Sequence, residues 1–92
     1  MRTFPGDLII KSEKHRAMRY EYDSKSPDGW VIAGNPASDL MFREMVCLVL
    51  AIMGCNHLGY RMMLLSTEGG TGWFRISKSL SNVFDGFGWR CV

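Results

Sequence analysis

The sequence predicts an α+β fold, in which one buried helix packs across one face of an antiparallel sheet of about five short strands. Three observations support this prediction. Short aliphatic or alternating runs occur in both halves of the chain, turn-forming residues separate them, and the most apolar run, residues 37 to 54, lies between them. The expected order is therefore three strands, the helix and two further strands.

Three strands are expected before the helix. Residues 8 to 10 are three consecutive aliphatic residues, which is typical of a short strand. In residues 16 to 23, a methionine and two tyrosines alternate with residues that are mostly charged, a pattern that predicts a half-buried strand. A proline and an Asp-Gly pair mark residues 24 to 29 as a loop, and a third strand follows at residues 30 to 33.

The central helix is expected over residues 36 to about 53. Asn35 can accept a hydrogen bond from an unpaired backbone amide, Pro36 fits the first helical position, and Gly54 can end the helix. Apolar residues go almost all the way round this helix, which indicates burial on most sides. Periodicity alone does not exclude a buried strand at Met45 to Met53, but the length of the run and its Asn-Pro start favour the helix.

Two strands follow the helix. Residues 60 to 65 and 73 to 77 are expected to pair as a hairpin, because the glycine-rich segment 66 to 72 between them is typical of a turn. Residues 79 to 92 form a C-terminal tail rich in glycine and aromatic residues. A chain of 92 residues is expected to make a single domain, 1 to 92.

Composition and charge limit the classes of function. The net charge of +2, from 11 basic and 9 acidic residues, is too small to indicate nucleic-acid binding by itself. Three cysteines without a C-x-x-C pair favour reduced thiols in a cytoplasmic protein, and the initial methionine favours a stand-alone protein. Arg43 and Glu44 interrupt the apolar run, which is shorter than the roughly 20 residues that a bilayer requires. No membrane association is therefore expected.

No catalytic, metal or cofactor site is predicted. Cys55 and His57, with Cys47 and Cys91, offer zinc-binding chemistry or a cysteine nucleophile with a base, but the spacing lacks the tight pairs of structural zinc sites and no third orienting residue is identifiable. The glycine-rich loop 68 to 72 lacks the Gly-Lys-Ser/Thr of a phosphate loop, so a hairpin turn is favoured. We therefore expect no enzyme, no cofactor and no small-molecule substrate.

The surplus of apolar residues predicts an interface. Met62 and Met63 are neighbours on one predicted strand, as are Leu64 and Leu65, so they point to opposite faces of the sheet. A two-layer protein leaves one sheet face uncovered, which indicates that another chain buries it. The candidate partner-binding residues are Met63, Leu65, Trp73, Phe87, Trp89 and Arg90.

The expected function is that of a small non-enzymatic protein-binding factor, whose partner is another protein or its own copy. Chain length alone suggests a phage or mobile-element accessory protein, or an inhibitor that occupies a host nucleic-acid-processing defence complex. The alternative is direct nucleic-acid binding through the basic hairpin at residues 11 to 19, beside two tyrosines. The candidate residues for that alternative are Lys11, Lys14, Arg16 and Arg19.

Overall fold

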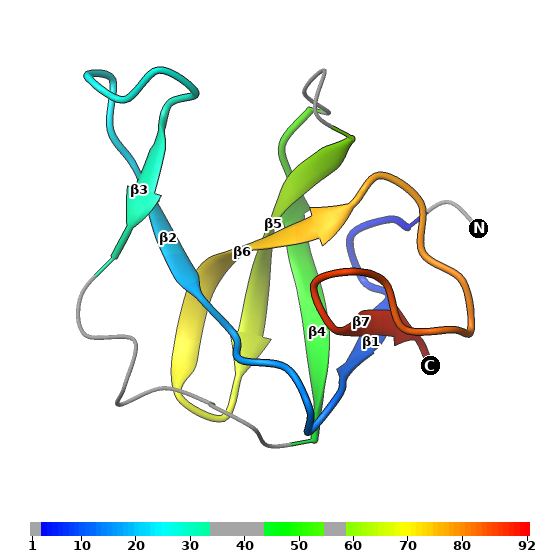
Figure 1. Cartoon of the computed structure of the whole chain (residues 1–92). Helices are drawn as coiled ribbons and strands as arrows, with labels where there is room; N and C mark the ends of the chain where they lie inside the picture. The colour runs from blue at the N-terminus through cyan, green and yellow to red at the C-terminus, as the bar shows by residue number, and fades with distance from the viewer. Residues whose placement is uncertain (1–2, 34–43, 55–58) are drawn as a thin grey trace.

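The computed structural model describes residues 3–33, 44–54 and 59–92. Within these residues the secondary structure is entirely β: seven antiparallel strands form one sheet with the order β3-β2-β6-β5-β4-β1-β7 (Figure 1). The strands are β1 (Leu8–Lys11), β2 (Arg19–Tyr22), β3 (Trp30–Ile32), β4 (Met45–Ile52), β5 (Tyr60–Thr67), β6 (Gly70–Ser77) and β7 (Trp89–Cys91).

The β5–β6 hairpin forms the middle of the sheet and confirms the hairpin that the sequence predicts. Its strands pair in continuous register from Tyr60 opposite Ser77 to Thr67 opposite Gly70. Gly70 has a φ of 105°, a conformation that side-chain-bearing residues rarely adopt. The Thr67 hydroxyl donates to the Gly70 carbonyl oxygen at 2.6 Å, which closes the turn. The chemistry of this turn therefore fixes the register of β5 and β6.

The predicted α+β fold is wrong, because residues 45 to 52 of the predicted helix form strand β4. Of the rest of that helix, residues 36 to 43 fall outside the described residues, and Glu44 and Met53 flank the strand. Burial in β4 alternates from Met45, which is buried, to Val46, which is exposed, and continues to Leu50. Every side chain from 45 to 52 is apolar, so this period of two leaves no trace in the sequence. The structure thus selects the strand that periodicity left open.

The sheet curls around its own core. β6 and β7 are separated by three strands in the sheet order, yet the rings of Phe74 on β6 and Trp89 on β7 pack 5.7 Å apart in an edge-to-face arrangement. Such a contact requires the β1–β7 end of the sheet to fold back over β6. The inner face is therefore covered by the sheet itself, and the predicted helix is not needed to form a core.

The C-terminal tail contributes to this core. Leu80 and Trp89 are buried, and β7 pairs with β1 so that Trp89 lies opposite Lys11. The Asp85 carboxylate accepts hydrogen bonds from the backbone amides of Ser77, Phe87 and Trp89, at 2.8 to 2.9 Å. One side chain thus holds the turn that directs the chain into β7.

Candidate functional site

Three of the six predicted partner-binding residues lie in the core. Met63 and Leu65 have no exposed surface and Trp89 is 2% exposed, so a partner cannot contact them in this fold. The prediction of Met63 and Leu65 as contact residues assumed that one face of the sheet is left uncovered. The curled sheet instead places both β5 residues on its inner face, beside Phe74 of β6 and Val49 of β4.

The other three predicted partner residues are half-buried and lie apart. The Trp73 ring lies 5.5 Å from that of Trp30 on β3. Phe87 packs edge-to-face on Tyr60, with ring centroids 6.1 Å apart. The guanidinium of Arg90 lies 5.1 Å from the centre of the Phe84 ring, and its NH1 donates to the carbonyl of Cys91. These three side chains do not form one contiguous site.

The outer face of β1 and β4 carries apolar side chains that the sequence analysis did not single out. Each of its members is 38 to 52% exposed, and all are aliphatic or methionine; this outer apolar face consists of Leu8, Val46, Leu48, Leu50 and Met53. Leu8 lies directly opposite Leu48 in the register of β1 and β4. Assigning residues 45 to 52 to a strand would have placed Val46, Leu48 and Leu50 on one face, but would not have shown which face is outward, because both faces are apolar.

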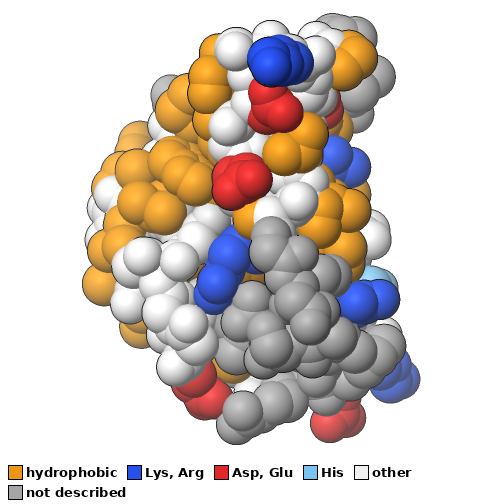
Figure 2. Space-filling model, turned by 90° about the vertical axis from the view of Figure 1, so that its left-hand side faces the viewer, with side chains coloured by type: hydrophobic (Ala, Val, Ile, Leu, Met, Phe, Trp, Pro, Cys, Tyr) orange, Lys and Arg blue, Asp and Glu red, His pale blue; other side chains and the backbone are white. Residues whose placement is uncertain are grey.

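The outer apolar face continues across the sheet toward β2. Ala51 lies opposite Leu64 on β5, Leu64 opposite Trp73 on β6, and Trp73 opposite Tyr20 on β2. Residues opposite one another in antiparallel strands share a face, so this row joins β4 to the aromatic side chains of the far strands. Hydrophobic side chains gather along the left of the space-filling view in Figure 2. The described part of the sheet thus has an extended apolar exterior.

A small cavity of about 150 Å³ opens where β2 diverges from β6. We call it the cationic pocket, because its polar lining includes His15, Arg16 and Arg75, while Tyr20, Phe87 and Trp89 are among its aromatic walls. The Arg75 guanidinium lies 4.8 Å from the centre of the Tyr20 ring and 4.4 Å from that of Tyr60. Two cation–π contacts therefore hold the charge of Arg75 in a fixed position.

The four predicted nucleic-acid-binding residues divide into two groups. Lys11 is fully buried, and its Nζ donates to the carbonyl oxygens of Ser12, at 2.7 Å, and His15. Burial lowers the pKa of this ammonium group. Lys11 is therefore a core residue and cannot reach a phosphate, since alternation on β1 directs it inward, opposite Trp89.

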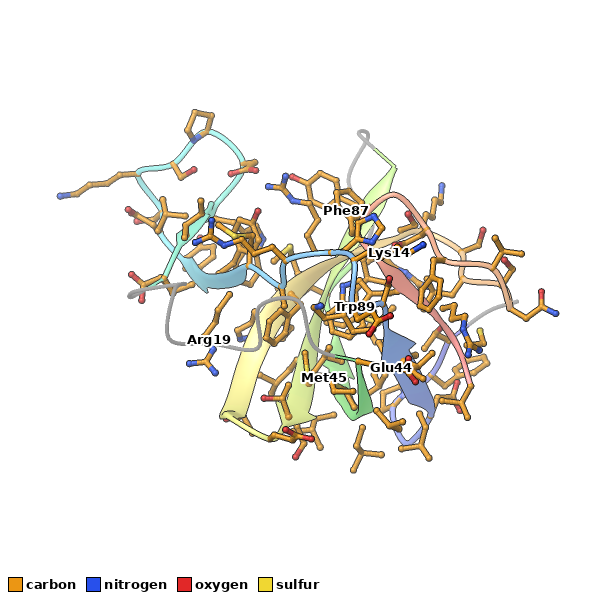
Figure 3. All side chains as sticks on the ribbon, turned by 60° about the horizontal axis from the view of Figure 1, so that its bottom comes forward. Lys14, Arg19, Glu44, Met45, Phe87 and Trp89 are labelled. Carbon is orange, nitrogen blue, oxygen red and sulfur yellow. The ribbon has the colours of Figure 1, made fainter. Side chains whose placement is uncertain are left out.

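Lys14, Arg16 and Arg19 remain at the surface. Lys14 and Arg16 are exposed; Arg19 is half-buried, and its NH2 donates to the Gly69 carbonyl at 3.4 Å. In the view of Figure 3, Lys14 lies near Phe87, whereas Arg19 lies on the far side of Trp89. Arg75 on β6, which was not predicted from the sequence, lines the cationic pocket together with Arg16.

The cysteines do not form a reactive centre in the described part of the chain. Cys47 is buried in the core, and burial together with the nearby Glu68 raises the pKa of its thiol to about 11, an effect that Lys11 partly opposes. Cys91 is half-buried on β7. Cys55 and His57 fall outside the described residues. Among residues that are described, no three His, Cys, Asp or Glu side chains cluster as metal ligands.

Cys47 is expected to react with iodoacetamide at pH 8 far more slowly than Cys91. A pKa of about 11 instead of 9.0 lowers the thiolate fraction about 100-fold, and burial restricts access further. Peptide mass spectrometry after timed labelling measures both rates in the folded protein. In denaturant the two cysteines should react at similar rates. Equal rates in the folded protein would contradict the burial of Cys47.

Comparisons with family models, with curated proteins and with solved structures found no match to this chain. In the described residues, no helix is long and apolar enough to cross a membrane. The proposal on function therefore rests on the surfaces of the chain itself.

Proposed function

We propose that this chain is a non-enzymatic protein-binding factor that docks its outer apolar face against an apolar surface of another protein. The observation that supports the proposal is the exposure of Val46, Leu48 and Leu50 on one strand with Leu8 beside them. Contiguous apolar patches on a small protein are typical of interaction sites. Covering the exposed half of each aliphatic side chain on binding would stabilise the complex by about 1 kcal/mol.

The chemistry of the face favours a protein partner over a small molecule. The outer apolar face carries no charged side chain, and its residues lie on two neighbouring strands. A regular sheet face matches another sheet or an apolar helix, because both present side chains at fixed spacing. A second copy of the chain offers the same surface and would pair with it about a two-fold axis.

The remaining expectations belong to this proposal as well. A cytoplasmic location is supported by the odd number of cysteines and by the two described ones, which are free thiols. The narrower role of a phage or mobile-element accessory protein, or of an inhibitor of a defence complex, rests on chain length and stays a prediction.

Replacing Val46 with glutamate is expected to weaken partner binding at least tenfold, because a carboxylate would be buried without a counter-charge. Val46 is 52% exposed, so the free protein should tolerate the change. Val83→Glu is the matched control, since Val83 is 70% exposed on the loop before β7, away from β1 and β4. Light scattering at tens of micromolar measures self-association, and affinity capture from cells that express the tagged chain measures binding to other proteins.

Two results would contradict the proposal. One is a wild-type chain that stays monomeric and captures no stoichiometric protein. The other is a Val46→Glu variant that binds its partner as tightly as wild type and Val83→Glu do. A doubled mass that Val46→Glu alone returns to the monomer would identify a second copy as the partner.

A further inference from the structure

The cationic pocket is separate from the outer apolar face and has a different chemistry. Its volume of about 150 Å³ is smaller than the roughly 300–1,000 Å³ of sites that enclose a whole small molecule. It can therefore hold one chemical group, such as a phosphate, while the rest of the ligand lies outside. A ligand for this pocket is thus expected to extend over the neighbouring surface.

The charge of the pocket favours an anion. Arg16 and Arg75 line it together with His15, and no carboxylate side chain is among its described lining residues. The Nε of Arg75 is buried without a hydrogen-bond partner in the part of the chain that the structure describes. Hydrogen bonds from a guanidinium group to an anionic oxygen are strong, so an anion in the cavity would pair with the accessible donors of Arg16 and Arg75.

Asp85, the acidic residue of the β6–β7 loop, lies outside the pocket lining and uses its carboxylate to hold the backbone. Both carboxylate oxygens of Asp85 accept hydrogen bonds, one from Ser77 and the other from Phe87 and Trp89. Asp85 therefore holds the backbone of the loop and is not among the side chains that line the pocket. The loop instead presents the Phe87 ring to the pocket beside the two arginines.

The walls of the pocket can hold a flat ring. Tyr20 and Phe87 are half-buried, and both line the cavity. Tyr60 supports the arrangement from behind: its ring contacts Phe87 and Arg75, and its hydroxyl donates to Asp28 at 3.0 Å. Aromatic side chains next to fixed cations are the usual means of binding single-stranded nucleic acid, because bases stack and phosphates pair.

Exposed cations continue from the pocket along the chain. Arg16 lines the cavity, and Lys14, two residues before it, is exposed as well. We propose that the cationic pocket binds one nucleotide unit of a single-stranded nucleic acid, with a phosphate at Arg16 and Arg75 and a base against Phe87. Lys14 then contacts a neighbouring phosphate. A polymeric anion explains both the small cavity and the exposed lysine near it.

The test is the binding of a fluorescent oligothymidylate of about a dozen nucleotides, long enough to cover a single site. Fluorescence anisotropy at low salt compares wild type with Arg16→Glu. Arg16 is exposed, so this variant should keep its fold, and circular dichroism checks that it does. Lys25→Glu is the matched control, because it makes the same charge change at an exposed site on the β2–β3 loop, outside the pocket lining.

We expect Arg16→Glu to weaken binding at least tenfold and Lys25→Glu to change it less than about twofold. Phe87→Ala should also weaken binding, since a stacked base would lose its partner. The proposal is overturned if wild type does not bind at low salt, or if the two charge reversals have equal effects, which would indicate non-specific attraction. It is also overturned if a duplex, inorganic phosphate or thymidine monophosphate binds as tightly as the single strand.

Discussion

Replacing Trp89 with alanine is expected to destabilise the protein by about 3–5 kcal/mol. The Trp89 side chain is 2% exposed, contacts the ring of Phe74, and joins the β7 end of the sheet to β6. Alanine would leave a cavity at the place where the curled sheet meets itself. A small domain has a total stability of only about 5–15 kcal/mol, so this substitution removes a large share of it.

Urea unfolding followed by far-ultraviolet circular dichroism measures the loss, because the substitution removes one of the three tryptophans that fluorescence would report. Val83→Ala is the control: that side chain is 70% exposed and should change stability by less than about 0.5 kcal/mol. If Trp89→Ala cost less than about 1 kcal/mol, Trp89 would not occupy the core and the curled sheet would be incorrect.

Replacing Gly88 with alanine is expected to lower the free energy of unfolding by about 2–5 kcal/mol, from two separate causes. Gly88 has a φ of 89°, which costs a residue with a side chain about 1–2 kcal/mol. An added Cβ would also lie 2.7 Å from Cγ of His15 and closer still to its Cβ, so the β1–β2 connection would have to move. Such crowding adds about 1–3 kcal/mol.

Gly6→Ala separates the two causes. Gly6 has a similar φ of 97°, but an added Cβ there meets nothing within 4 Å. Urea unfolding of both variants, followed by tryptophan fluorescence, should therefore show the smaller loss for Gly6→Ala. Equal losses would indicate that His15 does not pack against Gly88, and that the wall of the cationic pocket at this point is more open than described.

Local patterns were sufficient to predict the strands that have turn-forming residues at both ends. The β5–β6 hairpin was predicted because two β-rich runs flank a glycine-rich turn, and β1 and β3 because short aliphatic runs are bounded by turn residues. β4 could not be identified by its alternation, since both of its faces are apolar. A run of this kind satisfies a helix and a strand equally well, and only tertiary structure decides between them.

The site was harder to predict than the strands. Lys11 and Arg16 are both basic and five positions apart, yet one lies in the core and the other lines a pocket. Lys11 is buried because it ends β1 opposite Trp89 of β7, whereas Arg16 lies on the connection that follows β1. Long-range pairing of this kind leaves no local trace, so Arg75 and the outer apolar face were also missed.

The position of β1 has a consequence for synthesis on the ribosome. β1 lies between β4 and β7, so the first of the seven strands to be made has one of its two neighbours in the strand that is made after the other six. Until Trp89–Cys91 leaves the exit tunnel, one edge of β1 has no strand beside it and the sheet cannot close. Emergence of β7 from the ribosome, rather than of any earlier strand, therefore sets the moment at which this sheet can close.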